Sequence, residues 1–153
     1  YRPREVEVDG LLYREGLNAV AVRGGTAGNV IPDSCVVTVN YRFAPSQSVE
    51  GAGEHVREVF DGFEVRVVDA AGGARPGLDH PAAQQFSQAV LAVTGGAPTA
   101  KLGWTDVARF GALGVPAVNF GPGDPLLAHA DDEQCPVDQI ESVHRALASW
   151  LAG

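Results

Sequence analysis

The sequence of 153 residues contains no methionine, two cysteines and a single lysine. Because a natural chain begins with methionine, its absence leads us to expect a processed protein or a piece of a longer one. Cys35 and Cys135 belong to no C-x-x-C pair, which excludes a dense disulfide framework and favours a reducing cytoplasm. Long hydrophobic runs are missing too, and a membrane-spanning helix needs about 20 apolar residues in succession. We therefore expect no membrane partner.

Positive charge is also scarce. Eleven basic residues stand against 19 acidic ones, and the formal net charge is -8. A nucleic-acid surface needs clustered Lys and Arg to bind phosphates, so this balance argues against DNA or RNA binding. The sequence has no phosphate-binding Gly-rich motif, and no Ser, Cys or Thr has the context of an activated nucleophile. With 45% hydrophobic and 20% charged residues, the composition is that of an ordinary soluble globular protein.

The first half of the chain is patterned for β-strands. We expect strands over 6–14, 17–23, 34–43 and 63–69, and a helix over 49–60. The clearest alternation is in 34–43, where one face carries Cys35, Val37, Val39, Tyr41 and Phe43. This order of strands and helix predicts an antiparallel sheet that is covered on one side.

Residues 70–79 are rich in Gly and lack periodicity, which is typical of a crossover between two substructures. After them we expect helices over 81–94, 106–113 and 136–151, and short strands over 99–102 and 116–120. Strands that alternate with helices imply a parallel sheet covered by helices. The prediction is an α/β chain of two parts, 1–76 and 77–153.

The loop after 116–120 has the most informative pattern. The run NFGPGD (119–124) leads to His129, which is followed by Asp131, Asp132 and Glu133. Open α/β sheets bind ligands at the carboxyl ends of their strands. A neutral imidazole is a common zinc ligand, and a neighbouring carboxylate can orient it, although a lone His is more often a surface residue. The other histidines are expected to be capping or solvated residues: His55, His80 and His144.

Two other places could bind an anion. Arg42 lies on a polar strand face, where its guanidinium can clamp a carboxylate or pair with a surface acid. Asn29 closes the Gly-rich loop 24–29. In the turn GWTD (103–106), Thr105 can cap the following helix and Asp106 can favour its positive end, or the turn amides can cradle an anion.

Six segments of the chain form a shared pattern. They are LLYREGLNAV at 11–20, GNVIP at 28–32, NYRF at 40–43, GWTD at 103–106, ARF at 108–110, and NFGPGD with AH and DE between 119 and 133. Together and in this order they resemble the two-zinc aminoacylase and carboxypeptidase family of metallopeptidases. The similarity extends over essentially the whole chain.

The resemblance implies the C-terminal portion of a zinc-dependent amide hydrolase. Residues 1–76 would be the later part of an inserted, ferredoxin-like α/β lid through which two subunits form a homodimer. Residues 77–153 would be the C-terminal part of a zinc-peptidase-like α/β catalytic domain. Two zinc ions are implied for each site, with cobalt able to substitute.

The resemblance also implies roles for individual residues. His129 matches the last zinc ligand, Asn29 and Arg42 match positions that reach substrate, including across the dimer, and Thr105 and Arg109 match the lining of the substrate pocket. The remaining ligands and the general-base Glu are absent from this sequence and are expected upstream, so no catalytic residue is assigned. We expect the chain alone to be inactive.

The implied substrate is a small molecule bearing carboxylates, N-succinyl-diaminopimelate, hydrolysed to succinate and diaminopimelate. Two alternatives stay open. One is a sibling hydrolase that removes acetyl groups or acts as a carboxypeptidase. The other is a non-catalytic module, in which the lid part supplies a dimerisation surface.

Overall fold

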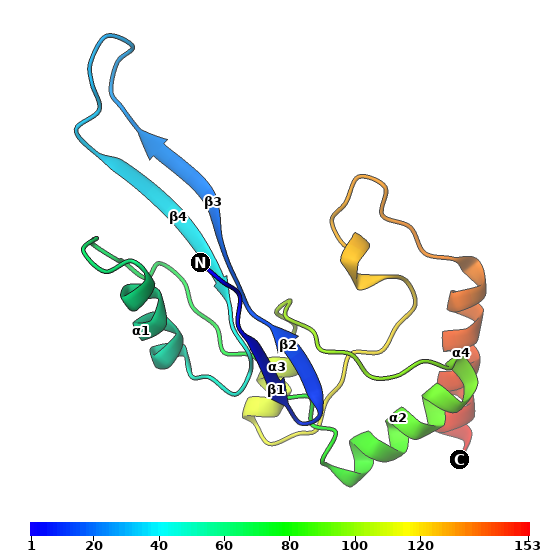
Figure 1. Cartoon of the computed structure of the whole chain (residues 1–153). Helices are drawn as coiled ribbons and strands as arrows, with labels where there is room; N and C mark the ends of the chain where they lie inside the picture. Colours follow the sequence, from blue (N-terminus) through cyan, green and yellow to red (C-terminus); the bar gives the residue numbers. More distant parts are fainter.

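A computed structural model describes residues 1–153 as a mixed α/β chain (Figure 1). Its elements, in order, are β1 (Glu5–Val8), β2 (Leu11–Arg14), β3 (Gly16–Gly24), β4 (Cys35–Arg42), α1 (Val49–Val59), α2 (Pro81–Thr94), α3 (Val107–Ala112), the short 3-10 helix η1 (Pro125–Leu127) and α4 (Val137–Ala152).

The first hairpin corrects the single strand expected over 6–14. β1 pairs with β2 in antiparallel register around Asp9 and Gly10, which have φ angles of 51° and 77°. Two successive positive φ values define the type I′ turn that matches the twist of paired strands. Asp-Gly is a sequence signal for this turn, so the run folds back on itself instead of continuing.

The second hairpin is the longest feature of the molecule and projects away from the rest of it (Figure 1). β3 pairs antiparallel with β4 from Gly16 opposite Arg42 to Gly24 opposite Cys35. A register shift between Ala19 and Ala21 leaves Val20 as the extra residue of a bulge. The strands expected over 17–23 and 34–43 are confirmed, but the two hairpins form separate two-stranded sheets instead of one sheet.

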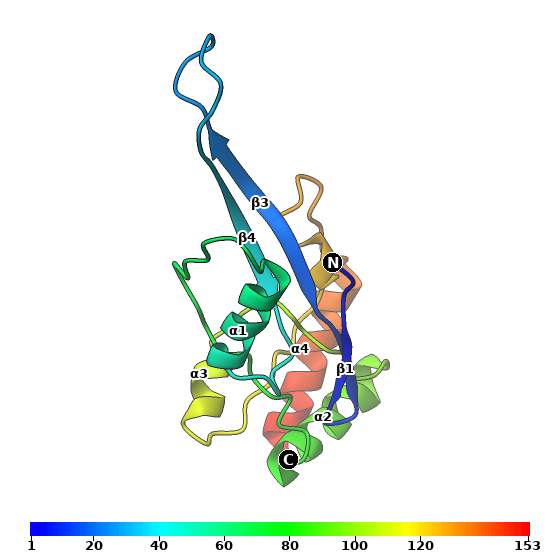
Figure 2. The ribbon, with the colours of Figure 1, turned by 60° about the vertical axis from the view of Figure 1, so that its left-hand side comes forward.

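Helix α1 confirms the helix expected over 49–60 and lies against one side of this hairpin. It begins after Ser48, whose Oγ accepts a hydrogen bond from the Gly51 N–H at 3.1 Å. The rings of Tyr41 and His55 lie 5.3 Å apart, and both views place α1 beside β4 (Figures 1 and 2). On the face of β4 that carries Tyr41, α1 thus covers the Tyr41 end, whereas Val37, farther along the same face, is 49% exposed.

In the second half, the three predicted helices are confirmed. α2 begins at Pro81, and the His80 Nδ1 accepts a hydrogen bond from the Ala82 N–H at 3.2 Å, so His80 is a capping residue, as expected. α2 packs against α4, where the rings of Phe86 and Trp150 meet edge-on at 4.9 Å.

The three short strands expected over 63–69, 99–102 and 116–120 are wrong, and with them the parallel sheet. None of these segments has a partner strand, and all of their residues are exposed or only partly buried coil. Ala100 and Leu102 instead pack as coil on the small core of Val8, Tyr13 and Ala44.

The molecule is open and leaves much of its apolar surface exposed. Its accessible surface is 11285 Å², whereas a compact protein of 15.9 kDa exposes about 7,400 Å². Val22 on β3 is 66% exposed and Ile31, in the loop between β3 and β4, is 91% exposed. No helix here combines the length and the apolar composition that crossing a bilayer requires.

Candidate functional site

The turn before α3 and the segment that ends at Asn119 are joined by a side-chain hydrogen bond. The Asn119 Nδ2 donates to the Thr105 Oγ1 at 3.1 Å. Thr105 is half-buried, and its backbone carbonyl accepts a hydrogen bond from the Ala108 N–H at 3.1 Å. Asp106, and not Thr105, occupies the N-cap position of α3, so the capping role considered for Thr105 is wrong; Asp106 lies at the positive end of the helix, as expected, but its side chain makes no capping hydrogen bond. Two of the sequence motifs therefore meet at Thr105.

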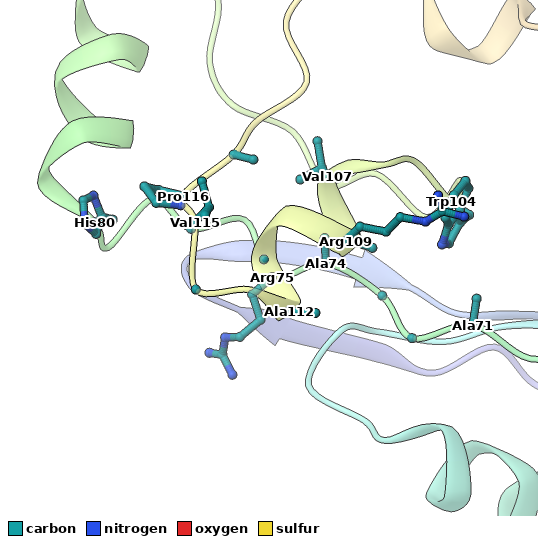
Figure 3. A pocket seen from close by; sticks show the side chains of 17 residues that line it. Ala71, Ala74, Arg75, His80, Trp104, Val107, Arg109, Ala112, Val115 and Pro116 are labelled. Atoms are coloured by element: carbon teal, nitrogen blue, oxygen red, sulfur yellow. The ribbon is translucent and has the colours of Figure 1, made fainter.

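Arg109 presents its guanidinium beside this turn. Its Cζ lies 5.2 Å from the centre of the Trp104 ring, and its Nη1 lies 3.7 Å from the Asp106 Oδ1. Figure 3 shows the Arg109 side chain extended towards Trp104. A guanidinium has five N–H donors, so this arrangement leaves donors free for a carboxylate ligand.

An open groove of about 690 Å³ lies between α3 and the coil at 71–77 (Figure 3). Its positively charged lining residues are Arg75 and Arg109. Arg75 is already engaged, because its Nε and Nη2 donate to the Asp9 Oδ2 and Oδ1 at 3.2 and 2.5 Å. This contact with Asp9 raises the pKa of Arg75. Arg109 is therefore the cation of the groove that can meet an incoming anion.

His129 lies in the exposed loop after η1, in a left-handed backbone conformation with φ of 68°. The Glu133 Oε2 accepts a hydrogen bond from the backbone N–H of His129 at 3.0 Å. The Gly123 N–H donates to the Gln139 Oε1 at 2.9 Å, which ties the start of this loop to α4. Glu133 therefore holds the backbone of the loop and not the imidazole, which faces solvent.

The side chains of this chain do not form a zinc site by themselves. No group of three or more His, Cys, Asp or Glu side chains lies together in a way that could hold a metal ion. A zinc site takes three or four protein ligands. His129 can supply one ligand, and the neighbouring acidic residues do not converge on it.

Asn29 and Arg42 lie at opposite ends of the long hairpin. Arg42 is paired with Gly16 at its base, and Asn29 lies in the loop beyond Gly24 and Cys35 at its tip. The eight residues of β4 between these ends span roughly 25 Å. The two side chains therefore cannot bind the same small molecule within one chain.

A buried carboxylate that the sequence does not reveal fixes the base of the hairpin. Glu15 is 2% exposed, and its Oε1 accepts a hydrogen bond from the Ala44 N–H at 2.9 Å. Its Oε2 accepts from the Arg4 Nε at 2.7 Å and from the Tyr41 hydroxyl at 2.8 Å. Burial opposes the charge, but these three hydrogen bonds and the positive charge of Arg4 together outweigh it and hold the pKa of this carboxyl below its usual value. Burial and the nearby carboxylate raise the pKa of Tyr41.

The sequence is similar to known hydrolases over its whole length. The sequence model of peptidase family M20/M25/M40 matches residues 6–152. A putative succinyl-diaminopimelate desuccinylase of Mycobacterium tuberculosis is 56% identical over 155 residues, 100% of this chain and 43% of that protein. The succinyl-diaminopimelate desuccinylase of Corynebacterium glutamicum is 49% identical, covering 99% of this chain and 42% of that protein.

A more distant relative has another substrate in its name. The acetylornithine deacetylase of Myxococcus xanthus is 30% identical over 145 residues, which are 89% of this chain and 37% of that protein. The chain thus spans about two fifths of the length of these relatives.

Proposed function

Because this chain belongs to peptidase family M20/M25/M40, we propose that it works within an amide hydrolase that releases succinate from N-succinyl-diaminopimelate. The observation that carries the proposal is the 56% identity, over the whole chain, to a relative named for that reaction. The identity to the acetylornithine deacetylase is lower, at 30%. The two unpaired cysteines support a reducing cytoplasm as the compartment.

The proposed organisation assigns residues 1–76 to a dimerisation lid and residues 77–153 to a catalytic domain. The projecting hairpin with α1 on one face supports the first assignment. The second is supported by the position of Thr105, Arg109 and His129, which all lie beyond residue 77.

In this proposal, His129 is one ligand of a zinc site whose other ligands, and whose general base, come from residues outside this chain. Thr105 and Arg109 bind a carboxylate of the substrate. We use the term complete enzyme for a protein that carries these 153 residues together with the missing ligands. Zinc, when bound, would polarise the amide carbonyl and activate water.

The homodimer is proposed to form through the long hairpin. Val22 and Val37 are directly paired across β3 and β4 and are exposed, so they offer an apolar surface to a second copy. Arg42 and Asn29 are both proposed to contact substrate, and the distance between them suits two different active sites. Asn29, at the hairpin tip, would reach the site of the partner.

The test is a comparison of substrates with the complete enzyme and zinc. We expect kcat/KM to be highest for N-succinyl-LL-diaminopimelate and lower for N-acetylornithine and for a dipeptide. A higher value for N-acetylornithine would assign the chain to a sibling hydrolase. The 153-residue chain with added zinc or cobalt should release no succinate, and appreciable hydrolysis would contradict the need for further ligands.

The large exposed apolar surface also favours the second candidate, a non-catalytic interaction module. The two-stranded sheet of β3 and β4 has unpaired edges that can accept another strand. Sedimentation of the 153-residue chain distinguishes the two. A discrete dimer supports the module, whereas aggregation or unfolding supports a part of a larger enzyme.

A further inference from the structure

The hydrogen bond between Asn119 and Thr105 has a direction. The amide nitrogen of Asn can only donate, whereas a Thr hydroxyl has one proton to donate and two lone pairs that accept. Since the Asn119 Nδ2 donates to the Thr105 Oγ1, the contact uses a lone pair of the hydroxyl and leaves its proton free. No protein acceptor takes that proton.

We propose that Asn119 is a positioning residue, which holds the Thr105 hydroxyl so that its proton is directed to a carboxylate of the substrate. This inference rests on the proposed function and deepens it, because it gives the substrate-binding turn a preferred ligand chemistry. An ionised carboxylate only accepts hydrogen bonds, so it complements a hydroxyl whose proton is free while one of its lone pairs is held by Asn119.

Arg109, on α3, places a positive charge beside the turn. That guanidinium is steadied by Trp104 and is only loosely paired with Asp106, at 3.7 Å. Hydrogen bonds that involve an ionised group are roughly twice as strong as those between neutral groups. Arg109 on α3 and Thr105 in the turn before it therefore both offer donors to the same kind of anion.

Asn119 is itself anchored, which a positioning role requires. The ring of its neighbour Phe120 meets the ring of Phe86 on α2 edge-on, with the centres 5.6 Å apart. The Val115 N–H donates to the Phe110 carbonyl at 3.0 Å, which ties the segment leading to Asn119 to the end of α3. Thr105 thus receives its orientation from a segment that is fixed on two sides.

The test measures steady-state kinetics of the complete enzyme with N-succinyl-LL-diaminopimelate. Asn119→Ala should raise KM about tenfold, the size expected for a lost hydrogen bond that orients a charged contact, and leave kcat within a factor of two. Thr105→Val should raise KM at least as much, and Thr105→Ser, which keeps the hydroxyl, should restore it. Adding Asn119→Ala to Thr105→Val should have no further effect.

Product inhibition identifies the carboxylate. A higher inhibition constant for succinate in Asn119→Ala places the contact on the succinyl group, and a higher constant for diaminopimelate places it on the amine product; either result supports the proposal. Unchanged constants for both, or KM effects that multiply in the double variant, would overturn it.

Thermal melting shows whether each variant is folded. If Asn119→Ala does not fold, the comparison of Thr105→Ser with Thr105→Val decides, and equal KM values in these two would overturn the inference. If the unaltered complete enzyme does not hydrolyse the substrate, the proposed function is overturned instead. The assay of the unaltered enzyme comes first, so the two failures are distinguished.

Discussion

The Arg4 Nε donates to the Glu15 Oε2 across 2.7 Å, and the Arg4 Nη2 donates to the Gln47 Oε1 at 3.0 Å. A carboxylate removed from water is costly unless its lone pairs are satisfied, and Glu15 also accepts from Tyr41 and from the Ala44 N–H. The Glu15 side chain, just before β3, therefore joins the N-terminal segment at Arg4 to the end of the hairpin at Tyr41 and Ala44.

We expect Glu15→Gln to destabilise the fold by about 2 kcal/mol, because a neutral amide gives weaker hydrogen bonds and its NH2 group adds a donor to a site that already contains three donors. Urea unfolding monitored by circular dichroism measures the change. The matched control is Glu7→Gln, an exposed residue of β1. Equal stability of the two variants would contradict the role assigned to Glu15.

The same carboxyl makes stability depend on pH. The pKa of Glu15 is lower in the folded chain than its usual 4.5, so the folded state binds its proton less readily than the unfolded state does. This contribution is present above the unfolded pKa and is lost as pH falls through the folded pKa. The difference in unfolding free energy between the unaltered chain and Glu15→Gln should stay constant from pH 7 to 5 and shrink below pH 4. A difference that grows on acidification would refute this sign.

Gly10 is needed for the turn between β1 and β2. With φ of 77°, an alanine there would bring its Cβ too close to the backbone, at a cost of about 1 kcal/mol. Gly10→Ala should lower the urea midpoint accordingly. Gly28→Ala is the control. Gly28 does not have a positive φ, and a Cβ added there would meet open space. An equal drop of the urea midpoint in Gly28→Ala would contradict the role of the φ angle at Gly10.

His129→Ala should lower the zinc content of the complete enzyme as well as its activity, because the loss of one ligand weakens a metal site. Metal analysis after dialysis measures zinc per subunit. His144→Ala, an exposed histidine on α4, is the control and should keep full metal content. Unchanged zinc in His129→Ala would refute the ligand assignment.

Val37→Lys should dissociate the proposed homodimer, because it places a charge in the apolar pair with Val22. Sedimentation velocity of the complete enzyme at several concentrations reports the change. Val68→Lys, in coil and 80% exposed, is the control and should leave the dimer intact. A monomeric unaltered enzyme, or a dimeric Val37→Lys variant, would contradict the proposed interface.

Local signals in the sequence predicted the helices and the long hairpin. The caps at Ser48 and His80 and the spacing of apolar residues act within a few positions, so α1, α2 and α4 follow from short windows. The alternation in β4 is equally local. Asp9-Gly10 was also a local signal, and the first hairpin could have been predicted from it.

The misplaced strands depended on distant partners. The segments 63–69 and 116–120 have the apolar character of strands, but a strand exists only where another one pairs with it, and no short window contains that information. The candidate site shows the same difference between local signals and distant contacts. The sequence identified the motifs around Thr105 and Asn119 separately, whereas their contact spans 14 positions, and the burial of Glu15 needed Arg4, Tyr41 and Ala44 to come together.

The contacts of Glu15 also bear on the rate of folding. The hairpin of β1 and β2 closes over two residues, whereas the hydrogen bonds of Glu15 join positions 11, 26 and 29 apart. Closing longer loops costs more chain entropy, so distant contacts form later than nearby ones. Weakening a late contact mainly accelerates unfolding. The carboxylate at the base of the hairpin would then determine how long the folded state persists more than how quickly it is reached.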